Sequence, residues 1–327
     1  MHVHASNTCR RIPTISISLL LGLMFFFVAC NEDDPERAYD YSSNLNSNAT
    51  QTEAGAPSYG KIVNYGNVRG VTEGNTDICE VANRLEIPRL RGGATNLFIV
   101  HTTDEYGVNY CVEWNCELRA QYWSAFRWDK SNTLNNTSRS EAWANNPLIP
   151  ADCISTQADY SGSGYTRGHI LASQDRVNSL EANMQTFYFS NIHPQLYGFN
   201  TQVWLEMEKR LRNIYNKNSF RDTLYVVKGG TISQGMYNIP QNMSIPVPKY
   251  FFMAILRQKS TDKSQNGFAA MGFWIEHKAN SDTELGKYTV SIDRLEELTG
   301  IDFFCNLPDD IEEQVESNYV PAVWKFN

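Results

Sequence analysis

The amino-acid sequence predicts an α+β fold, in which a mainly antiparallel central sheet is flanked by helices. Short runs rich in β-branched and aromatic residues, which are typical of strands, outnumber the helical segments. One segment, residues 200–214, instead repeats its apolar residues at the spacing of a helix. No internal repeat is visible, and the length suits a single domain with one sizeable core.

The predicted strands lie on both sides of this helix along the chain. They comprise residues 97–101, 108–114 and 123–128 before it, and residues 223–227, 249–256 and 268–276 after it. His101 falls in the first strand, and we expect it to be a strand residue and not a ligand. A short helix is predicted over residues 292–298, because Ser291 can cap its start and Gly300 can end it.

The first residues of the chain are predicted to direct secretion. An apolar run over residues 15–28 follows a short basic segment. It is shorter than the about 20 residues that span a bilayer, and it fits the core of a secretory signal peptide. The run ends at Cys30 in a sequence that resembles a bacterial lipobox, so residues 1–29 would be removed and Cys30 would carry the lipid. An ordinary signal peptide cleaved nearby is the alternative.

Residues 30–57 are predicted to form a flexible tether between Cys30 and a folded domain over residues 58–327. The tether segment is polar, is rich in Asn, Ser, Thr and Ala, and shows no apolar periodicity. The acidic run over residues 32–34 resembles the surface-export signal of some lipoproteins, with a solvated charge run as the alternative. We therefore expect an outer-membrane lipoprotein that faces the periplasm or the cell surface.

Five of the seven cysteines would remain after removal of the signal peptide and lipidation of Cys30. They are Cys79, Cys111, Cys116, Cys153 and Cys305. Outside the cytoplasm some of them should form disulfides, and an odd number leaves at least one thiol. A zinc site is the alternative, but no CxxC pair or Cys/His cluster supports it.

The segment over residues 165–211 contains the residues best suited to chemistry. It opens with Arg167-Gly168-His169, which places a cation and a base suited to neutral pH on either side of a glycine. In an extended segment Arg167 and His169 share one face, because strands repeat every two residues. Gly168 would leave room for a ligand to approach closely.

A set of motifs further along this segment extends the pattern. They are Ser190-Asn191-Ile192, Pro194-Gln195, Phe199-Asn200, Trp204 and Glu208. With the Arg-Gly-His tripeptide they resemble the DNA/RNA non-specific endonuclease family, sugar-non-specific nucleases with a ββα-metal active site. The similarity extends to residues 225–229, 245–248 and 295–308, and it covers roughly residues 95–325. One departure is Thr166, which stands where the family motif usually has Asp and carries no charge.

The resemblance implies a metal-dependent phosphodiesterase that acts on DNA and RNA. His169 would be the general base, because the pKa of histidine lies near neutrality. Asn200 would be the main protein ligand of Mg²⁺, with Mn²⁺ as the alternative ion, although an asparagine at a helix start is often only a cap. On a straight helix Glu208 would lie about 12 Å from Asn200 along the axis. Glu208 would therefore act through a metal-bound water, unless the turn at Asn200 folds back.

The resemblance assigns further residues to the phosphate and to the base. Arg167 would hold the phosphate through two hydrogen bonds, or stabilise the charge that develops on it. Arg139, in a polar loop, aligns loosely with a family arginine that meets the phosphate, and a solvated arginine is the alternative. Asn191 would lie near His169, with a turn asparagine as the alternative. His193 falls at an unspecified position of the family motif and is left out of the chemistry.

The acidic net charge bears on a competing function. Removal of residues 1–29 would change the net charge from −8 to −10, whereas nucleic-acid affinity comes largely from neutralised phosphates. Part of the acidic excess lies outside the motifs, in the tether and in residues 309–316. The charge and Thr166 favour a non-catalytic surface lipoprotein that binds nucleic acid or glycan, whereas the otherwise intact motif set favours the enzyme.

Overall fold

The structure is a computed structural model that describes residues 47–48 and 62–326. The predicted signal peptide, the predicted lipidation site at Cys30 and most of the predicted tether lie outside the described residues. Within the described part of the chain, no helix is both long enough and apolar enough to cross a membrane.

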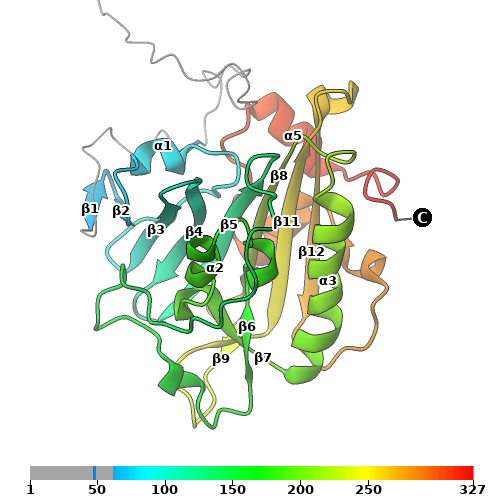
Figure 1. Ribbon diagram of the computed structural model, residues 1–327. Coiled ribbons are helices and arrows are strands. Elements are labelled where there is room, and N and C mark those ends of the chain that lie inside the picture. Colours follow the sequence, from blue (N-terminus) through cyan, green and yellow to red (C-terminus); the bar gives the residue numbers. More distant parts are fainter. Residues whose placement is uncertain (1–46, 49–61, 327) are drawn as a thin grey trace, which may run out of the picture. The chain divides into compact units, whose positions relative to one another are not determined.

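A nine-stranded sheet forms the centre of the described domain (Figure 1). Its strand order is β1-β2-β3-β4-β5-β8-β11-β12-β13, and every neighbouring pair is antiparallel except β2 with β3. The strands are β1 (Val63–Tyr65), β2 (Val68–Thr72), β3 (Asn96–Thr103), β4 (Gly107–Asn115), β5 (Ala120–Trp128), β8 (Thr223–Gly230), β11 (Tyr250–Gln258), β12 (Phe268–Glu276) and β13 (Thr289–Val290). Each strand predicted from the sequence is present, and the predicted α+β class is confirmed.

Two small sheets and several helices complete the described domain. Strand β6 (Thr166–His169) pairs with β7 (Ile192–Gln195), and β9 (Tyr237–Asn238) pairs with β10 (Val247–Pro248). The α-helices are α1 (Ile78–Ala82), α2 (Leu180–Gln185), α3 (Leu205–Arg210), α4 (Ile292–Thr299) and α5 (Asp309–Ser317). Short 3₁₀ turns lie at Gln157–Tyr160, Ser173–Asp175, Phe189–Asn191, Ser264–Gly267 and Leu285–Tyr288. π-helical turns extend α3 at both ends, over Phe199–Trp204 and Leu211–Tyr215.

Helix α4 begins at the predicted residue and ends one residue later than predicted, before Gly300. The Ser291 hydroxyl accepts a hydrogen bond from the backbone amide of Arg294, which satisfies one of the free amides of the first turn. Gly300 follows the helix with a φ of 66°, a left-handed conformation that glycine adopts without steric cost.

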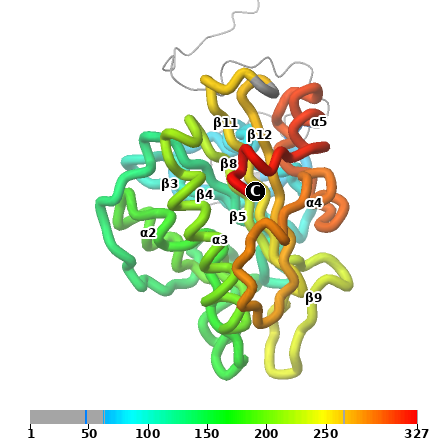
Figure 2. The backbone as a smooth tube through the Cα atoms, turned by 90° about the vertical axis from the view of Figure 1, so that its right-hand side faces the viewer, coloured from blue at the N-terminus to red at the C-terminus, as the bar shows by residue number. Residues whose placement is uncertain are grey.

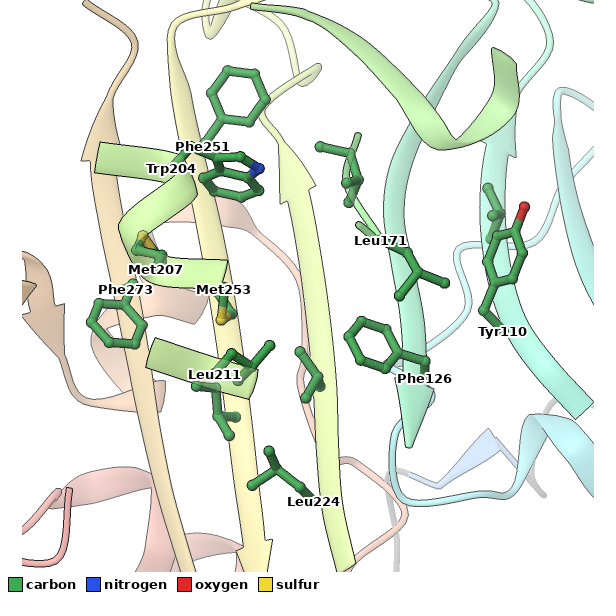
Figure 3. Packing of buried hydrophobic residues seen from close by; sticks show 14 of the residues in the cluster. Tyr110, Phe126, Leu171, Trp204, Met207, Leu211, Leu224, Phe251, Met253 and Phe273 are labelled. Atoms are coloured by element: carbon green, nitrogen blue, oxygen red, sulfur yellow. The ribbon is translucent and has the colours of Figure 1, made fainter. Parts of the chain in front are cut away.

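The sheet buries side chains on both of its faces. Successive strand residues point to opposite faces, so Leu224 packs into the cluster that contains Trp204 and Met253, whereas Tyr225 packs into the cluster that contains Leu295. Figure 3 shows Trp204 beside the strand residues of the first cluster. Figure 2 shows α2 and α3 on one side of the sheet and α4 and α5 on the other. Each large apolar side chain that is fully buried contributes about 1.5–3 kcal/mol to stability.

A disulfide joins the end of β4 to the loop that precedes the β6–β7 hairpin. It links Cys116 to Cys153, whose Cα atoms lie 4.7 Å apart. The prediction that some of the mature cysteines pair is therefore confirmed for these two. Cys79, Cys111 and Cys305 are buried thiols in the same domain.

Asn48 packs against the domain although the sequence places it in the flexible tether. Its side-chain amide donates hydrogen bonds to the carbonyls of Ala82 and Pro88, at 2.8 and 3.1 Å, and its Oδ1 accepts one from the amide of Leu90. Its backbone amide donates to Oδ1 of Asn306. The prediction of a free tether is therefore wrong for this residue, because its buried amide satisfies backbone groups of the domain.

Candidate active site

The predicted catalytic tripeptide lies in the β6–β7 hairpin. In this antiparallel pair Thr166 faces Gln195 and Gly168 faces His193. A Cβ atom on Gly168 would lie 2.1 Å from Cδ of Gln195, well inside van der Waals contact. The glycine is therefore required by the side chain of Gln195 in the same hairpin. The expectation that Gly168 makes room for a ligand is wrong at the position of its missing side chain, because Gln195 already fills that space.

The helix that contains α3 is hydrogen-bonded to the hairpin at two points. The indole Nε1 of Trp204 donates to the carbonyl of His169 at 3.1 Å. The side-chain amide of Asn200 donates to Oγ1 of Thr166 at 3.0 Å, and Thr166 in turn donates to the carbonyl of Gln195 at 2.9 Å. Strand, strand and helix thus form one ββα unit. Within it, the threonine at the family's Asp position orients the amide of Asn200.

His169 packs against two aromatic rings, Trp143 and Phe187, which also contact each other at 5.1 Å. Its ring centroid is 5.2 Å from that of Trp143 and 5.0 Å from that of Phe187. The side chain is buried, and its Nε2 has no hydrogen-bond partner among the described residues. Burial, reinforced by the positive charge of Arg139, lowers the pKa of His169 to about 3. His169 is therefore neutral at neutral pH, and the same burial makes it a weaker proton acceptor than an exposed imidazole.

Two arginines stack on these same rings. The Arg167 guanidinium lies 3.8 Å from the ring centroid of Trp143, and that of Arg139 lies 4.7 Å from the ring centroid of Phe187. Arg139 also donates to Oγ of Ser173 at 2.9 Å. Such cation–π contacts contribute about 0.5–2 kcal/mol and hold the planar guanidinium groups in place. The structure thus brings both predicted phosphate-binding arginines to the two rings that His169 also contacts.

Glu208 lies in α3 among charged groups. Its Oε1 is 3.9 Å from Nζ of Lys228 and its Oε2 is 4.0 Å from Nη1 of Arg212, which pairs with Asp175 at 2.7 Å. Burial raises the pKa of Glu208, and Lys228 is the strongest influence in the opposite direction. The carboxylate is thus held in place by cations on the helix and on β8.

Lys228 is a functional candidate that the sequence analysis missed. It is fully buried in β8, its Nζ has no hydrogen-bond partner among the described residues, and it lies 4.9 Å from the ring centroid of Trp204. Burial lowers its pKa, and Glu208 counteracts that shift. The signals in the sequence are a lysine at the end of an otherwise apolar strand and its place in the segment over residues 225–229 that resembles the family. A buried charge in that position is unfavourable unless a nearby opposite charge or hydrogen-bond partner compensates it.

Asn191 lies next to the hairpin, but all of its amide groups are used within the fold. Its Nδ2 donates to the carbonyls of Leu171 and Thr186, both at 2.8 Å. Its Oδ1 accepts from the amide of Leu171 at 2.9 Å and from the hydroxyl of Ser124 at 3.1 Å. These bonds hold the chain that follows His169, and the role of Asn191 beside His169 stays a prediction.

Two further histidines, His193 and His101, are held by groups of the fold. His193 is buried, with Nε2 3.2 Å from the carbonyl of Gln121. His101 is a buried residue of β3, as predicted, with Nε2 3.1 Å from the side-chain amide of Asn146.

The donor set of the ββα unit suits a largely hydrated divalent ion. The amide nitrogen of Asn200 is occupied by Thr166, so its oxygen Oδ1 is the atom available to a metal. Among the described residues, no cluster of three His, Cys, Asp or Glu ligands lies at this hairpin. Mg²⁺ is commonly bound through one or two protein oxygens while it keeps several waters. Asn200 is not the helix cap, since the helix begins at Phe199 and Gly198 occupies the N-cap position.

Known proteins resemble this chain over the region that contains the fold and the site described above. Residues 99–310 match the model of the family described as DNA/RNA non-specific endonuclease. A protein named Nuclease from Nostoc sp. is 32% identical over 213 residues, which cover 64% of this chain and 75% of that protein. Nuclease C1 from Cunninghamella echinulata var. echinulata is 30% identical over 211 residues, with 61% and 81% covered.

More distant relatives share the same region. Mitochondrial Nuclease EXOG from Xenopus laevis is 28% identical over 216 residues, which cover 62% of this chain and 58% of that protein. The solved structure of the EndoG/EndoGI complex superposes with a TM-score of 0.54 at 21% identity, over 66% of this chain and 89% of that chain, and shares the fold. The family match spans most of the described domain, including the whole ββα unit. The chain therefore belongs to the DNA/RNA non-specific endonuclease family, and it is a hydrolytic nuclease, not a non-catalytic binding protein.

Proposed function

We propose that this chain is a Mg²⁺-dependent endonuclease that hydrolyses phosphodiester bonds in DNA and RNA without sequence specificity. Mn²⁺ is the alternative ion. The observation that carries the proposal is the surroundings of His169, a buried histidine packed against two rings, each of which bears an arginine. The closeness of an imidazole and two guanidinium groups in one small region supports the proposal.

His169 takes the proton from the attacking water in the proposed mechanism. Its Nε2 is a buried atom with no hydrogen-bond partner among the described residues, and the lowered pKa keeps the ring neutral at neutral pH. A well-placed general base accelerates a reaction typically about 10²–10⁴-fold. The hydrogen bond from Trp204 to the carbonyl of His169 holds the strand that carries this base.

Arg167 and Arg139 bind the scissile phosphate in the same proposal. A guanidinium that is stacked on a ring presents its N–H groups in a fixed plane, which suits bidentate contact with phosphate oxygens. Such preorganised cations stabilise the charge that develops in the transition state.

Asn200 and Glu208 would hold the metal, Asn200 directly and Glu208 through a bound water. When bound, a divalent ion would polarise the phosphate and stabilise the departing oxygen. Thr166 keeps Oδ1 of Asn200 free for this task by accepting the amide N–H. Lys228 and Arg212 keep the carboxylate of Glu208 in position.

The lack of sequence specificity follows from what these residues can contact. Arginine, histidine and a hydrated metal address the phosphate, and contacts to phosphate carry no direct sequence information. The relatives reported above are themselves named as nucleases.

The purified full chain, kept in detergent, tests the reaction. It should nick supercoiled plasmid and degrade RNA in Mg²⁺, and both activities should stop when a chelator is added in excess. Activity that survives the chelator would contradict the metal-dependent mechanism.

We also propose that the enzyme is a secreted lipoprotein, anchored to the outer membrane by a lipid on Cys30. The lipobox-like sequence at the end of the apolar run supports it. Metabolic labelling with a fatty acid should mark the wild-type chain and should be lost in Cys30→Ser, because acylation needs the thiol. Label that persists in the mutant would exclude Cys30 as the lipidation site.

A further inference from the structure

A cluster of carboxylates joins the two helices that cover the sheet face opposite α3 (Figure 2). Helices α4 and α5 pack against each other and against β12. Asp293 and Glu296 of α4 and Glu316 of α5 each offer one carboxylate oxygen, and these three oxygens lie within 4.8 Å of one another. The cluster is separate from the ββα unit, since Trp204 and Met207 belong to the apolar cluster on the other face.

Glu316 is the unusual member of this cluster. It is only 6% exposed, and its Oε1 has no hydrogen-bond partner among the described residues. The neighbouring Glu296 is in part satisfied, because its Oε1 accepts a hydrogen bond from the backbone amide of Phe303 at 2.6 Å. A buried carboxylate oxygen without a donor costs free energy unless a proton or a cation compensates it.

The two helices supply no basic residue to the cluster. Helix α5 contains no Lys, Arg or His, and Arg294, the basic residue of α4, is directed to Glu297 at 2.6 Å. Burial and the nearby charge of Glu296 raise the pKa of Glu316, which is the effect expected of like charges brought together without a cation.

We propose that Asp293, Glu296 and Glu316 bind a hard divalent cation, Ca²⁺, that clamps α5 onto α4. Carboxylate oxygens are the preferred ligands of Ca²⁺, which accepts six to eight oxygens at about 2.3–2.6 Å in flexible geometry. Oxygens bound to one such ion lie at most about 5 Å apart, as these three do. Mg²⁺ is less suited, because it demands near-octahedral geometry at about 2.0–2.1 Å and is seldom held by an all-protein cage. The site is structural and does not depend on the proposed nuclease mechanism.

Thermal unfolding of the chelator-treated full chain in detergent tests this site. CaCl₂ at about a hundred times its dissociation constant should raise the Tm of the wild type by roughly 5 °C, because it binds only the folded state. In Glu316→Gln the shift should vanish, since the neutral amide removes one ligand charge. Asp310→Asn, at an exposed position of the same helix, is the matched control and should keep the wild-type shift.

A second variant and a second measurement cover the case in which Glu316→Gln does not fold. Asp293→Asn changes an exposed ligand, and it should weaken Ca²⁺ binding in calorimetry by at least about tenfold. Plasmid nicking in Mg²⁺ should be unchanged in both variants, which separates this site from the active site. The proposal is overturned if Ca²⁺ leaves the wild-type Tm unchanged, or if the variants bind Ca²⁺ as tightly as the wild type.

Discussion

The indole N–H of Trp204 donates a hydrogen bond to the backbone carbonyl of His169, at 3.1 Å. Trp204 lies one turn after Asn200 in the helix, so this bond fixes the helix that carries the proposed metal ligand to the strand that carries the proposed base. The same indole ring lies beside the ammonium of Lys228 and packs at 5.4 Å from the ring of Phe251. Trp204 therefore contributes to the relative placement of His169 and Asn200, together with the hydrogen bond from Asn200 to Thr166.

Trp204→Phe should lower both stability and turnover. Phenylalanine keeps most of the packing but cannot donate to His169, so stability should fall by about 1–2 kcal/mol in urea unfolding. The fall in kcat should exceed what the loss of folded protein explains, because the strand is no longer fixed to the helix. Trp274→Phe is the control. Trp274 is half-buried on β12 and stacks on Tyr250, so its loss should affect stability without a matching loss of kcat.

Gly168→Ala should destabilise the hairpin through a clash with Gln195. The added Cβ would lie 2.1 Å from Cδ of that side chain, and overpacking of this kind costs about 1–3 kcal/mol. Gln195→Ala removes the clashing atoms, so the double mutant should recover stability relative to Gly168→Ala alone. A double-mutant cycle from urea unfolding measures this recovery. Additive losses would show that the glycine serves something other than the packing of Gln195.

Lys228→Met should change the pH profile of the reaction. Lys228 is the main influence that lowers the pKa of Glu208, so its removal should shift the acid limb of kcat upward by at least about one pH unit. The substitution removes one partner of a buried ion pair and leaves the charge of Glu208 less compensated, so the free energy of unfolding in urea should also fall, by about 3–5 kcal/mol. The exposed Lys249→Met is the control, and it should leave the profile unchanged. An unchanged profile in Lys228→Met would remove Lys228 from the site.

Acid should weaken the fold through His169. Because burial lowers its folded pKa to about 3, below the usual value of about 6.5, folding favours the neutral form. The free energy of unfolding is therefore unaffected by this titration above about pH 6.5, and it decreases as the pH falls from there towards 3. Urea unfolding across this range should therefore show a smaller loss of stability in His169→Gln than in the wild type. Equal losses in the two proteins would mean that His169 does not titrate in this way.

Sequence patterns predicted the long strands and failed for features that depend on tertiary contact. β-branched and aromatic runs identify β3, β8 and β12, because such residues suit a sheet that is buried on both faces. The four-residue strands β6 and β7 contain glycine and proline and have no clear period, so only the motif resemblance drew attention to them.

The catalytic surroundings were predicted only in part. The motif identified Arg167 and His169, but the rings of Trp143 and Phe187 reach the site from separate loops, and no local spacing reports that contact. The separation of about 12 Å expected between Asn200 and Glu208 along the axis applies to a straight α-helix. The chain instead forms π-helical turns on both sides of α3.

Mg²⁺ titration by calorimetry of His169→Ala and Asn200→Ala tests the proposed division of roles most directly. Both variants are made in the Glu316→Gln background, so that the carboxylate cluster does not contribute to the heat. His169→Ala should bind Mg²⁺ as the parent does while plasmid nicking falls about 10²–10⁴-fold, because the base holds no metal. Asn200→Ala should lose Mg²⁺ affinity, because its amide oxygen is the direct ligand. Equal loss of Mg²⁺ affinity in both variants, or full nicking activity in His169→Ala, would contradict the account.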